Sequence, residues 1–218
     1  MRLIVFDMDG TLLDTAATIL RRVAGAFRGE GLTPPPAEVI RAHVGMTLGP
    51  YMARIAGTDD PDLAARLVAN YRAIAAAEPE NAMPLFHGVR PLLDSLHAAP
   101  GTLLGIATGK GRASLDRALE ENGISGHFQT VQTPDTNPGK PDPTMLRAAM
   151  SECGAGADET VMIGDAVLDI EMAKAAGVPA IGVSWGMQAP ALLVAAGAAA
   201  IAERVDVLGA AIDSIREP

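Results

Sequence analysis

Two aspartates one residue apart close the first apolar run of the chain. They are Asp7 and Asp9 in the segment VFDMDGTLLDT. Burying such carboxylates without partners costs several kcal/mol or forces them to take up protons. Their spacing after a core-building segment therefore predicts a site at which a positively charged group meets them.

Further polar residues follow later apolar segments in the same way. Thr108 closes TLLGIAT, Lys140 lies in GKPDP, and Asp165 and Asp169 lie in GDAVLD directly after TVMI. Ligands of open α/β sheets bind in the crevice at the carboxyl ends of the strands. We therefore expect these segments, which are far apart in the sequence, to converge with the first aspartate pair on a single site.

The inventory of this predicted site has a chemical logic. Four carboxylates and one lysine leave an excess of negative charge, and oxygen ligands alone select a hard cation, Mg²⁺ first. The lysine ammonium and the threonine hydroxyl suit phosphate oxygens, and the turn at Gly109 can present backbone N–H groups to an anion. The ensemble predicts phosphoryl transfer, in which charge neutralisation and positioning supply most of the catalysis.

The pattern along the chain predicts the elements that position these residues. Apolar runs bounded by turn residues predict strands at 3–6, 102–108, 129–132, 160–163, 180–183 and 199–201. Helical spacing of apolar residues predicts helices between these strands, including 89–98, 112–121, 143–153 and 166–176. Alternating strands and helices imply an α/β fold, with a Rossmann-like parallel sheet and helices on both of its faces.

One long segment interrupts the alternation. No strand signal appears between 15 and 80, where we expect helices at about 15–29, 37–43, 48–56 and 61–78. We therefore predict an α/β core formed by residues 1–14 and 84–218, and an inserted helical cap at 15–83.

Composition bounds the remaining possibilities. The 218-residue chain is 49% hydrophobic, which is enough for a sizeable core, and its formal net charge of -9 argues against binding to nucleic acid. A single cysteine, Cys153, excludes an intramolecular disulfide. The apolar run near the N-terminus is too short for a signal peptide, and we expect no membrane span and a cytoplasmic location. The expected partner is a small phosphate ester, and the pattern leaves monomer and homodimer open.

Four segments in order resemble the signature motifs of a known superfamily. DMDGTLLDT, IATGK, GKPDP and IGDAVLDIEMAKAAG are similar to the four motifs of the haloacid dehalogenase (HAD) superfamily. VQTPDTNPGKPDP and AIGVSWGM resemble the phosphoglycolate phosphatase-type members in particular. The resemblance implies a Mg²⁺-dependent phosphatase for a small phosphate monoester, with 2-phosphoglycolate as the first candidate substrate.

The resemblance also assigns roles to the first aspartate pair. Asp7 would be the nucleophile that forms an aspartyl-phosphate. Asp9 would protonate the leaving alcohol and then activate the water that hydrolyses the intermediate. Both would bind Mg²⁺, Asp7 through its carboxylate and Asp9 through its backbone carbonyl.

The later motifs would complete the site. By resemblance, Asp165 binds the metal and Asp169 supports it, while Thr108 and Gly109 hold a phosphoryl oxygen. Lys140 would neutralise the nucleophile and the phosphate together. One position departs from the family pattern, because Ala166 stands where related chains often carry a hydroxyl or amide residue.

Two other functions remain as alternatives. A phosphosugar mutase of the same superfamily would need an arginine in the cap after the glycine turn, and VGMTLGPYMAR has none before Arg54. A phosphoacceptor signalling domain would carry an adjacent acidic pair at its first strand and no cap. For the residues around these motifs we expect ordinary roles: Asp14 as a helix cap, and Arg41 on a solvated helix face.

Overall fold

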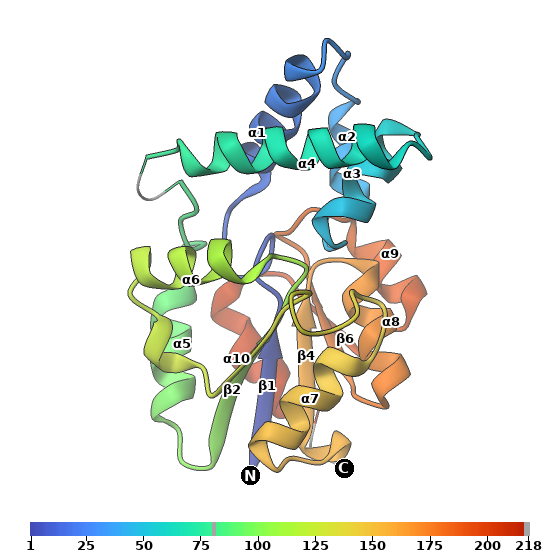
Figure 1. Ribbon diagram of the computed structural model, residues 1–218. Helices are drawn as coiled ribbons and strands as arrows, with labels where there is room; N and C mark the ends of the chain where they lie inside the picture. Colours follow the sequence, from blue (N-terminus) through green and yellow to red (C-terminus); the bar gives the residue numbers. More distant parts are fainter. Residues whose placement is uncertain (80–81, 216–218) are drawn as a thin grey trace.

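The computed structural model describes residues 1–79 and 82–215 (Figure 1). Six strands form one sheet in the order β3-β2-β1-β4-β5-β6, and each neighbouring pair in this order runs parallel. The strands are β1 (Arg2–Phe6), β2 (Thr102–Ala107), β3 (Thr130–Gln132), β4 (Thr160–Gly164), β5 (Ala180–Val183) and β6 (Ala200–Ala202). The predicted parallel α/β sheet is therefore confirmed.

Ten α-helices lie within the described ranges. They are α1 (Ala16–Gly29), α2 (Ala37–Ala42), α3 (Leu48–Ala56), α4 (Pro61–Ala76), α5 (Val89–Ala98), α6 (Arg112–Glu121), α7 (Thr144–Cys153), α8 (Val167–Ala176), α9 (Pro190–Ala196) and α10 (Val205–Ser214). Two short 3₁₀ turns lie at Ser125–His127 and Ala157–Glu159. No helix in these ranges is long and apolar enough to cross a membrane.

Alternating side chains of the strands bury two separate apolar layers. Ile4 and Phe6 of β1 pack with residues of α5, α6 and α10 on one face of the sheet. Leu3 and Val5 face the other way and pack with residues of α7, α8 and α9. This period of two, buried on both faces, explains why β1 reads as a continuous apolar run rather than as an alternating one.

The regular elements described between β1 and α5 are all helices. In Figure 1 the helices α1 to α4 lie beyond the carboxyl ends of the strands, and they enclose a third apolar cluster that includes Val23, Met52 and Leu67. Two linkers join this helical cap to the core and run side by side, with Leu13 bridged to Leu85. The exact boundaries proposed at 14/15 and 83/84 stay a prediction.

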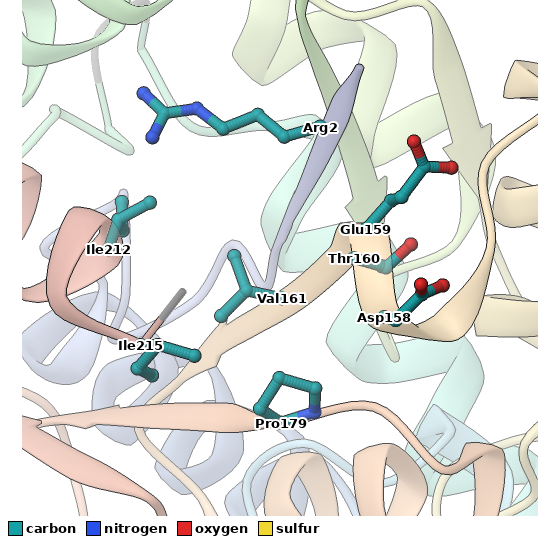
Figure 2. Close-up of a pocket in the computed structure, with 8 residues that line it drawn as sticks. All are labelled: Arg2, Asp158, Glu159, Thr160, Val161, Pro179, Ile212 and Ile215. Carbon is teal, nitrogen blue, oxygen red and sulfur yellow. The ribbon is translucent and has the colours of Figure 1, made fainter. Parts of the chain in front are cut away.

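A hollow lies at the end of the sheet opposite the cap. Its volume is about 340 Å³, and it is lined by the start of β1, by residues 158–161 at the start of β4, by Pro179, and by Ile212 and Ile215 near the end of α10 (Figure 2). The Arg2 side chain extends away from Asp158 and Glu159 in this view, and it is engaged by Thr102 and Asp213. The ion pair between Arg2 and Asp213 joins the start of β1 to α10 beside this hollow.

Candidate active site

Three adjacent strands bring the predicted aspartates together. β2, β1 and β4 are neighbours, so Thr108, Asp7 and Asp165 follow them at the same edge of the sheet. The Asp7 N–H donates to the Ile163 carbonyl at 2.9 Å, which continues the pairing of β1 with β4 past the end of the strand. The sheet itself therefore fixes the direction in which the Asp7 backbone enters the site.

Lys140 joins two of the buried carboxylates. Its Nζ lies 2.8 Å from Asp7 Oδ1 and 2.6 Å from Asp169 Oδ1, and its side chain is fully buried. Burial alone would lower the pKa of this lysine, but the Asp169 and Asp7 carboxylates outweigh that effect and raise the pKa above its usual value. Lys140 is therefore a permanent cation between Asp7 and Asp169.

Asp165 is held by hydrogen bonds from two sides. Its Oδ1 accepts from the Thr11 hydroxyl at 2.9 Å, and its Oδ2 accepts from the Met187 N–H at 2.8 Å. A Cβ atom on Gly10 or Gly186 would lie 2.2 Å or 2.1 Å from an Asp165 atom, so both positions need glycine. The sequence reading missed Thr11 and Gly186, although Thr11 stands inside the DMDGT segment that it quoted.

Asp169 supports the cluster from the first turn of α8. Its Oδ2 accepts from the Ala166 N–H at 3.0 Å, while its Oδ1 faces Lys140. Ala166 itself is buried and lies near the cap turn at Gly45, where an added Cβ would stand 3.5 Å from the Ala166 Cβ. A small residue at 166 therefore leaves room for the cap, and its backbone still orients Asp169.

Asp9 sits beside a second lysine that the sequence reading did not assign. Lys110 Nζ lies 2.9 Å from Asp9 Oδ2, and the Lys110 side chain is 6% exposed. The Asp9 Oδ1 is buried and accepts no hydrogen bond from the described part of the chain. One oxygen of Asp9 is thus held by a cation while the other is available for proton transfer. The signal for Lys110 was present in IATGK, where a second lysine follows the Thr108–Gly109 turn.

Thr108 and Gly109 lie where the core meets the cap. The Thr108 hydroxyl accepts from the Lys110 N–H at 3.2 Å, which shapes a tight turn after β2. A Cβ on Gly109 would stand 2.4 Å from the Gly45 carbonyl oxygen, so the cap turn packs directly on this backbone. Glycine at 109 is therefore required for this close contact with the cap.

A cavity of about 820 Å³ opens between the core and the cap. Asp7, Asp9, Thr108, Gly109 and Lys110 line it from the core side. The cap side is formed by α1, α3, α4 and the turn at 44–47, and it includes Ile19, Tyr51, Tyr71 and Arg72. This volume suits a small molecule, and the reactive carboxylates lie at its core end.

The buried carboxylates fit a divalent cation. Oxygen atoms of Asp7, Asp165 and Asp169 all lie within 4.8 Å of one another, and all three residues are buried. With Asp9, Lys110 and Lys140 included, the site carries an excess of two negative charges. Carboxylate oxygens whose negative charge is greater than the positive charge of the neighbouring lysines suit a hard ion such as Mg²⁺. Asp7 and Asp165 would hold it, and Asp169 would position them.

Burial and mutual repulsion shift the pKa values of the supporting carboxylates. Burial, with added repulsion from Asp7 and Asp169, raises the pKa of Asp165 well above its usual range. Burial is also the largest cause at Asp169, where it and Asp7 raise the pKa to about 6 against the opposing effect of Lys140. Without a metal, the folded protein therefore binds protons at these carboxyls that the unfolded chain releases.

This predicts a pH-dependent response to Mg²⁺. The stabilisation from protons on raised carboxyls is present at low pH and is lost as the pH rises through about 6. Mg²⁺ must displace these protons, so we expect it to raise Tm more at pH 8 than at pH 5, by several degrees, since 1 kcal/mol is worth about 2–4 °C in a chain of this size. Thermal unfolding with and without Mg²⁺ measures this.

The matched control is Asp165→Asn, which keeps the shape of the side chain and removes a metal ligand. It should lose most of the Mg²⁺ response at pH 8. Equal Tm shifts at the two pH values in the wild type would contradict the assignment of the ion to these carboxylates.

Comparison with known proteins places the chain in a family. The family model described as "Haloacid dehalogenase-like hydrolase" matches residues 4–183, a range that contains all four sets of site residues. The chain belongs to this family. It is an enzyme with the fold that the motifs predicted.

Individual relatives align with most of the length of this chain. The chain is 36% identical over 217 residues to "Probable phosphatase IndB" of Dickeya dadantii (strain 3937), covering 96% of this chain and 93% of the relative. It is 33% identical over 193 residues to a phosphoglycolate phosphatase of Rhodospirillum rubrum, covering 84% and 79%. The crystal structure of a predicted phosphatase from Clostridium acetobutylicum superposes with a TM-score of 0.88 at 26% identity, covering 98% of each chain.

Proposed function

We propose that this HAD-family hydrolase is a Mg²⁺-dependent phosphatase for small phosphate monoesters, with 2-phosphoglycolate as the first candidate substrate. The observation that carries the proposal is the position of Asp7. Its carboxylate is buried at the end of β1, lies 2.8 Å from Lys140 Nζ and lines the cavity together with Asp9 and Thr108. The phosphatase names of the relatives and the phosphoglycolate phosphatase of Rhodospirillum rubrum support it.

The first step is phosphoryl transfer to the protein. An oxygen of Asp7 attacks phosphorus, the bond from phosphorus to the ester oxygen breaks, and the leaving oxygen takes a proton from Asp9. Lys140 offsets the negative charge shared by Asp7 and the phosphoryl group. The backbone at Gly109 and the Thr108 hydroxyl, which line the same end of the cavity, would bind phosphoryl oxygens.

The second step hydrolyses the aspartyl-phosphate and restores the free enzyme. Asp9, now ionised, takes a proton from a water molecule, and the resulting hydroxide attacks the phosphorus of the aspartyl-phosphate. The bond from phosphorus to the Asp7 oxygen breaks, so inorganic phosphate leaves, and the Asp7 carboxylate and the protonated Asp9 are regenerated. A bound Mg²⁺ supplies charge neutralisation for the phosphate and its carboxylate neighbours. The cap over the cavity limits the entry of bulk water during transfer.

A phosphate-release screen tests the proposal. We expect Mg²⁺-dependent release of inorganic phosphate from one or a few small esters among about fifty metabolites, including phosphoglycolate, pyrophosphate, sugar phosphates and nucleotides. Chelation with EDTA should abolish the release, and added Mg²⁺ should restore it. The measurement is phosphate formed per unit time, at several protein concentrations.

Other outcomes identify the alternatives. Isomerised sugar phosphate without phosphate release would indicate a mutase, although Arg54 contacts His43 at 3.4 Å and does not line the cavity. A long-lived phosphoprotein without turnover would indicate a phosphoacceptor domain. Release from no ester would overturn the proposed phosphatase function.

A further inference from the structure

One cationic side chain that lines the cavity has no acidic partner among the described residues. Five cationic side chains line it, and four of them face an acidic partner. The four pairs are Arg22 with Glu78, Lys110 with Asp9, Arg112 with Asp116, and Arg117 with Glu121. Within residues 1–79 and 82–215, the fifth, Arg72, makes no ion pair or side-chain hydrogen bond.

Arg72 is presented to the cavity by the geometry of α4. Ala75 and Ala76 lie three and four residues further along the helix and line the same cavity. Their methyl groups leave space beside the guanidinium. Tyr71 precedes Arg72, and its ring lies 5.7 Å from the guanidinium of the buried Arg22. The Arg22 guanidinium is therefore occupied by its contacts with Tyr71 and Glu78, whereas the Arg72 side chain is exposed.

The two lysines of the site, Lys110 and Lys140, are already paired with carboxylates and are not free to bind a further anionic group. Lys140 is enclosed between Asp7 and Asp169, and Lys110 is held by Asp9 at 2.9 Å. Lys110 lines the core end of the cavity, where the phosphoryl group would react, and Lys140 is fully buried beside Asp7. Arg72 is on the cap side and can meet a different part of the same ligand.

We propose that Arg72 is a specificity-determining residue that binds a second anionic group of the substrate, a carboxylate or a further phosphate. This inference rests on the proposed phosphatase function and narrows its substrate class. A guanidinium offers two parallel N–H donors to a carboxylate or phosphate, and such charge-assisted pairs are among the stronger polar contacts in proteins. Substrates with a neutral tail would leave Arg72 without a partner and gain nothing from it.

Matched ester pairs test the inference. 2-Phosphoglycolate and 2-hydroxyethyl phosphate differ only in a carboxylate against a hydroxymethyl group, and 3-phosphoglycerate and glycerol phosphate repeat the contrast on a longer chain. The measurement is kcat/KM with Mg²⁺ for the wild type, Arg72→Ala and Arg72→Lys. The control variant is Arg41→Ala, which removes an exposed cap arginine that does not line the cavity.

We expect the wild type to prefer the acidic member of at least one pair. Arg72→Ala should lower kcat/KM for that member by about tenfold to a hundredfold, the range for a lost charge-assisted hydrogen bond, and should leave the neutral ester unchanged. Arg72→Lys should keep part of the preference, and Arg41→Ala should keep all of it. The unchanged neutral ester shows in the same assay that the variant is folded.

Three results would overturn the inference. The first is a wild type that does not discriminate within either pair. The second is an Arg72→Ala variant that slows both members equally, and the third is an Arg72→Ala variant that keeps the preference intact. Each of these leaves the phosphatase function standing, because phosphate is still released. Release from none of the four esters, nor from any compound of the wider screen, is the distinct result in which the proposed function itself fails.

Discussion

Asp7→Asn should abolish phosphate release, with kcat at least about 10⁴-fold below the wild type. The amide has nearly the shape of the carboxylate but carries no negative charge and is a poor nucleophile toward phosphorus. Substrate still meets Thr108, Gly109 and Lys110, so binding should persist where turnover does not. The measurement is steady-state phosphate release with the best substrate of the screen.

The fold should survive this substitution. Lys140 keeps its 2.6 Å contact with Asp169, so no buried cation is left without a partner. Removing the charge of Asp7 also lessens the repulsion that helps to raise the pKa values of Asp165 and Asp169. We therefore expect the metal-free variant to be at least as stable as the metal-free wild type, measured by urea unfolding in EDTA.

Asp9→Asn is the matched comparison. It retains the nucleophile and removes the proton carrier, so a phosphoprotein that is sensitive to hydroxylamine should form on Asp7 and turn over slowly. The same label should be absent from Asp7→Asn. Wild-type turnover in Asp7→Asn would exclude Asp7 as the nucleophile, whichever ester is used.

The core end of the site could be predicted because it depends on local chain pattern and one topological rule. Asp7, Thr108 and Asp165 each follow an apolar strand, and parallel strands end at the same edge of a sheet. Lys140 was predicted from its place after β3, and it lies between Asp7 and Asp169 as the charge argument requires. The convergence of these residues needed no knowledge of side-chain packing.

The contacts between the cap and the core could not be predicted in the same way. The approach of the Gly45 carbonyl to Gly109, and the place of Arg72 in the cavity wall, depend on how four helices dock as a unit. Helical periodicity shows which face of a helix is apolar but not which surface that face packs against. Lys110 stands in a quoted motif without an assigned role, because its ion pair with Asp9 forms between side chains beyond the strand ends, and no strand or helix pattern indicates such a pair.

One local expectation was wrong. Asp14 was predicted to cap the first helix of the cap, but α1 begins at Ala16 and its N-cap position is Thr15, which makes no side-chain capping bond. The Asp14 N–H instead donates to the Pro84 carbonyl at 2.8 Å, so Asp14 belongs to the paired linkers. Asp14 pairs with the linker at Pro84 and does not cap α1. The residues that mark the start of a helix in a sequence cannot indicate such a long-range contact.

Lys140→Met should have the largest effect on stability. The substitution removes the cation from among three buried carboxylates whose oxygens lie within 4.8 Å of one another. Taking away one partner of a buried ion pair costs about 3–5 kcal/mol because the remaining charge has lost its compensation. We expect a loss of that order in the free energy of unfolding at pH 8 in EDTA, measured by urea denaturation. The control is Lys174→Met on the exposed face of α8, which should change little.

The loss should depend on pH and on Mg²⁺ in a defined direction. Without Lys140, the remaining carboxylates can relieve their repulsion only by taking up protons or a cation, and protonation is complete only below their raised pKa values. The deficit of Lys140→Met should therefore be smaller at pH 5 than at pH 8, and Mg²⁺ at pH 8 should recover part of it. A deficit that is the same in all three conditions would indicate lost packing rather than lost charge.

A second substitution separates these two causes. Asp169→Asn in the Lys140→Met background removes one of the two carboxylates that the lysine contacted and leaves the methionine in place. If uncompensated charge is the cause, the double variant should be more stable than Lys140→Met alone at pH 8, which is coupling between residues in contact. If packing is the cause, the second change should destabilise further, because it also alters the hydrogen bond from Ala166 N–H to Asp169. Catalysis should stay impaired in both variants, since Asp7 has lost the cation that faced it at 2.8 Å.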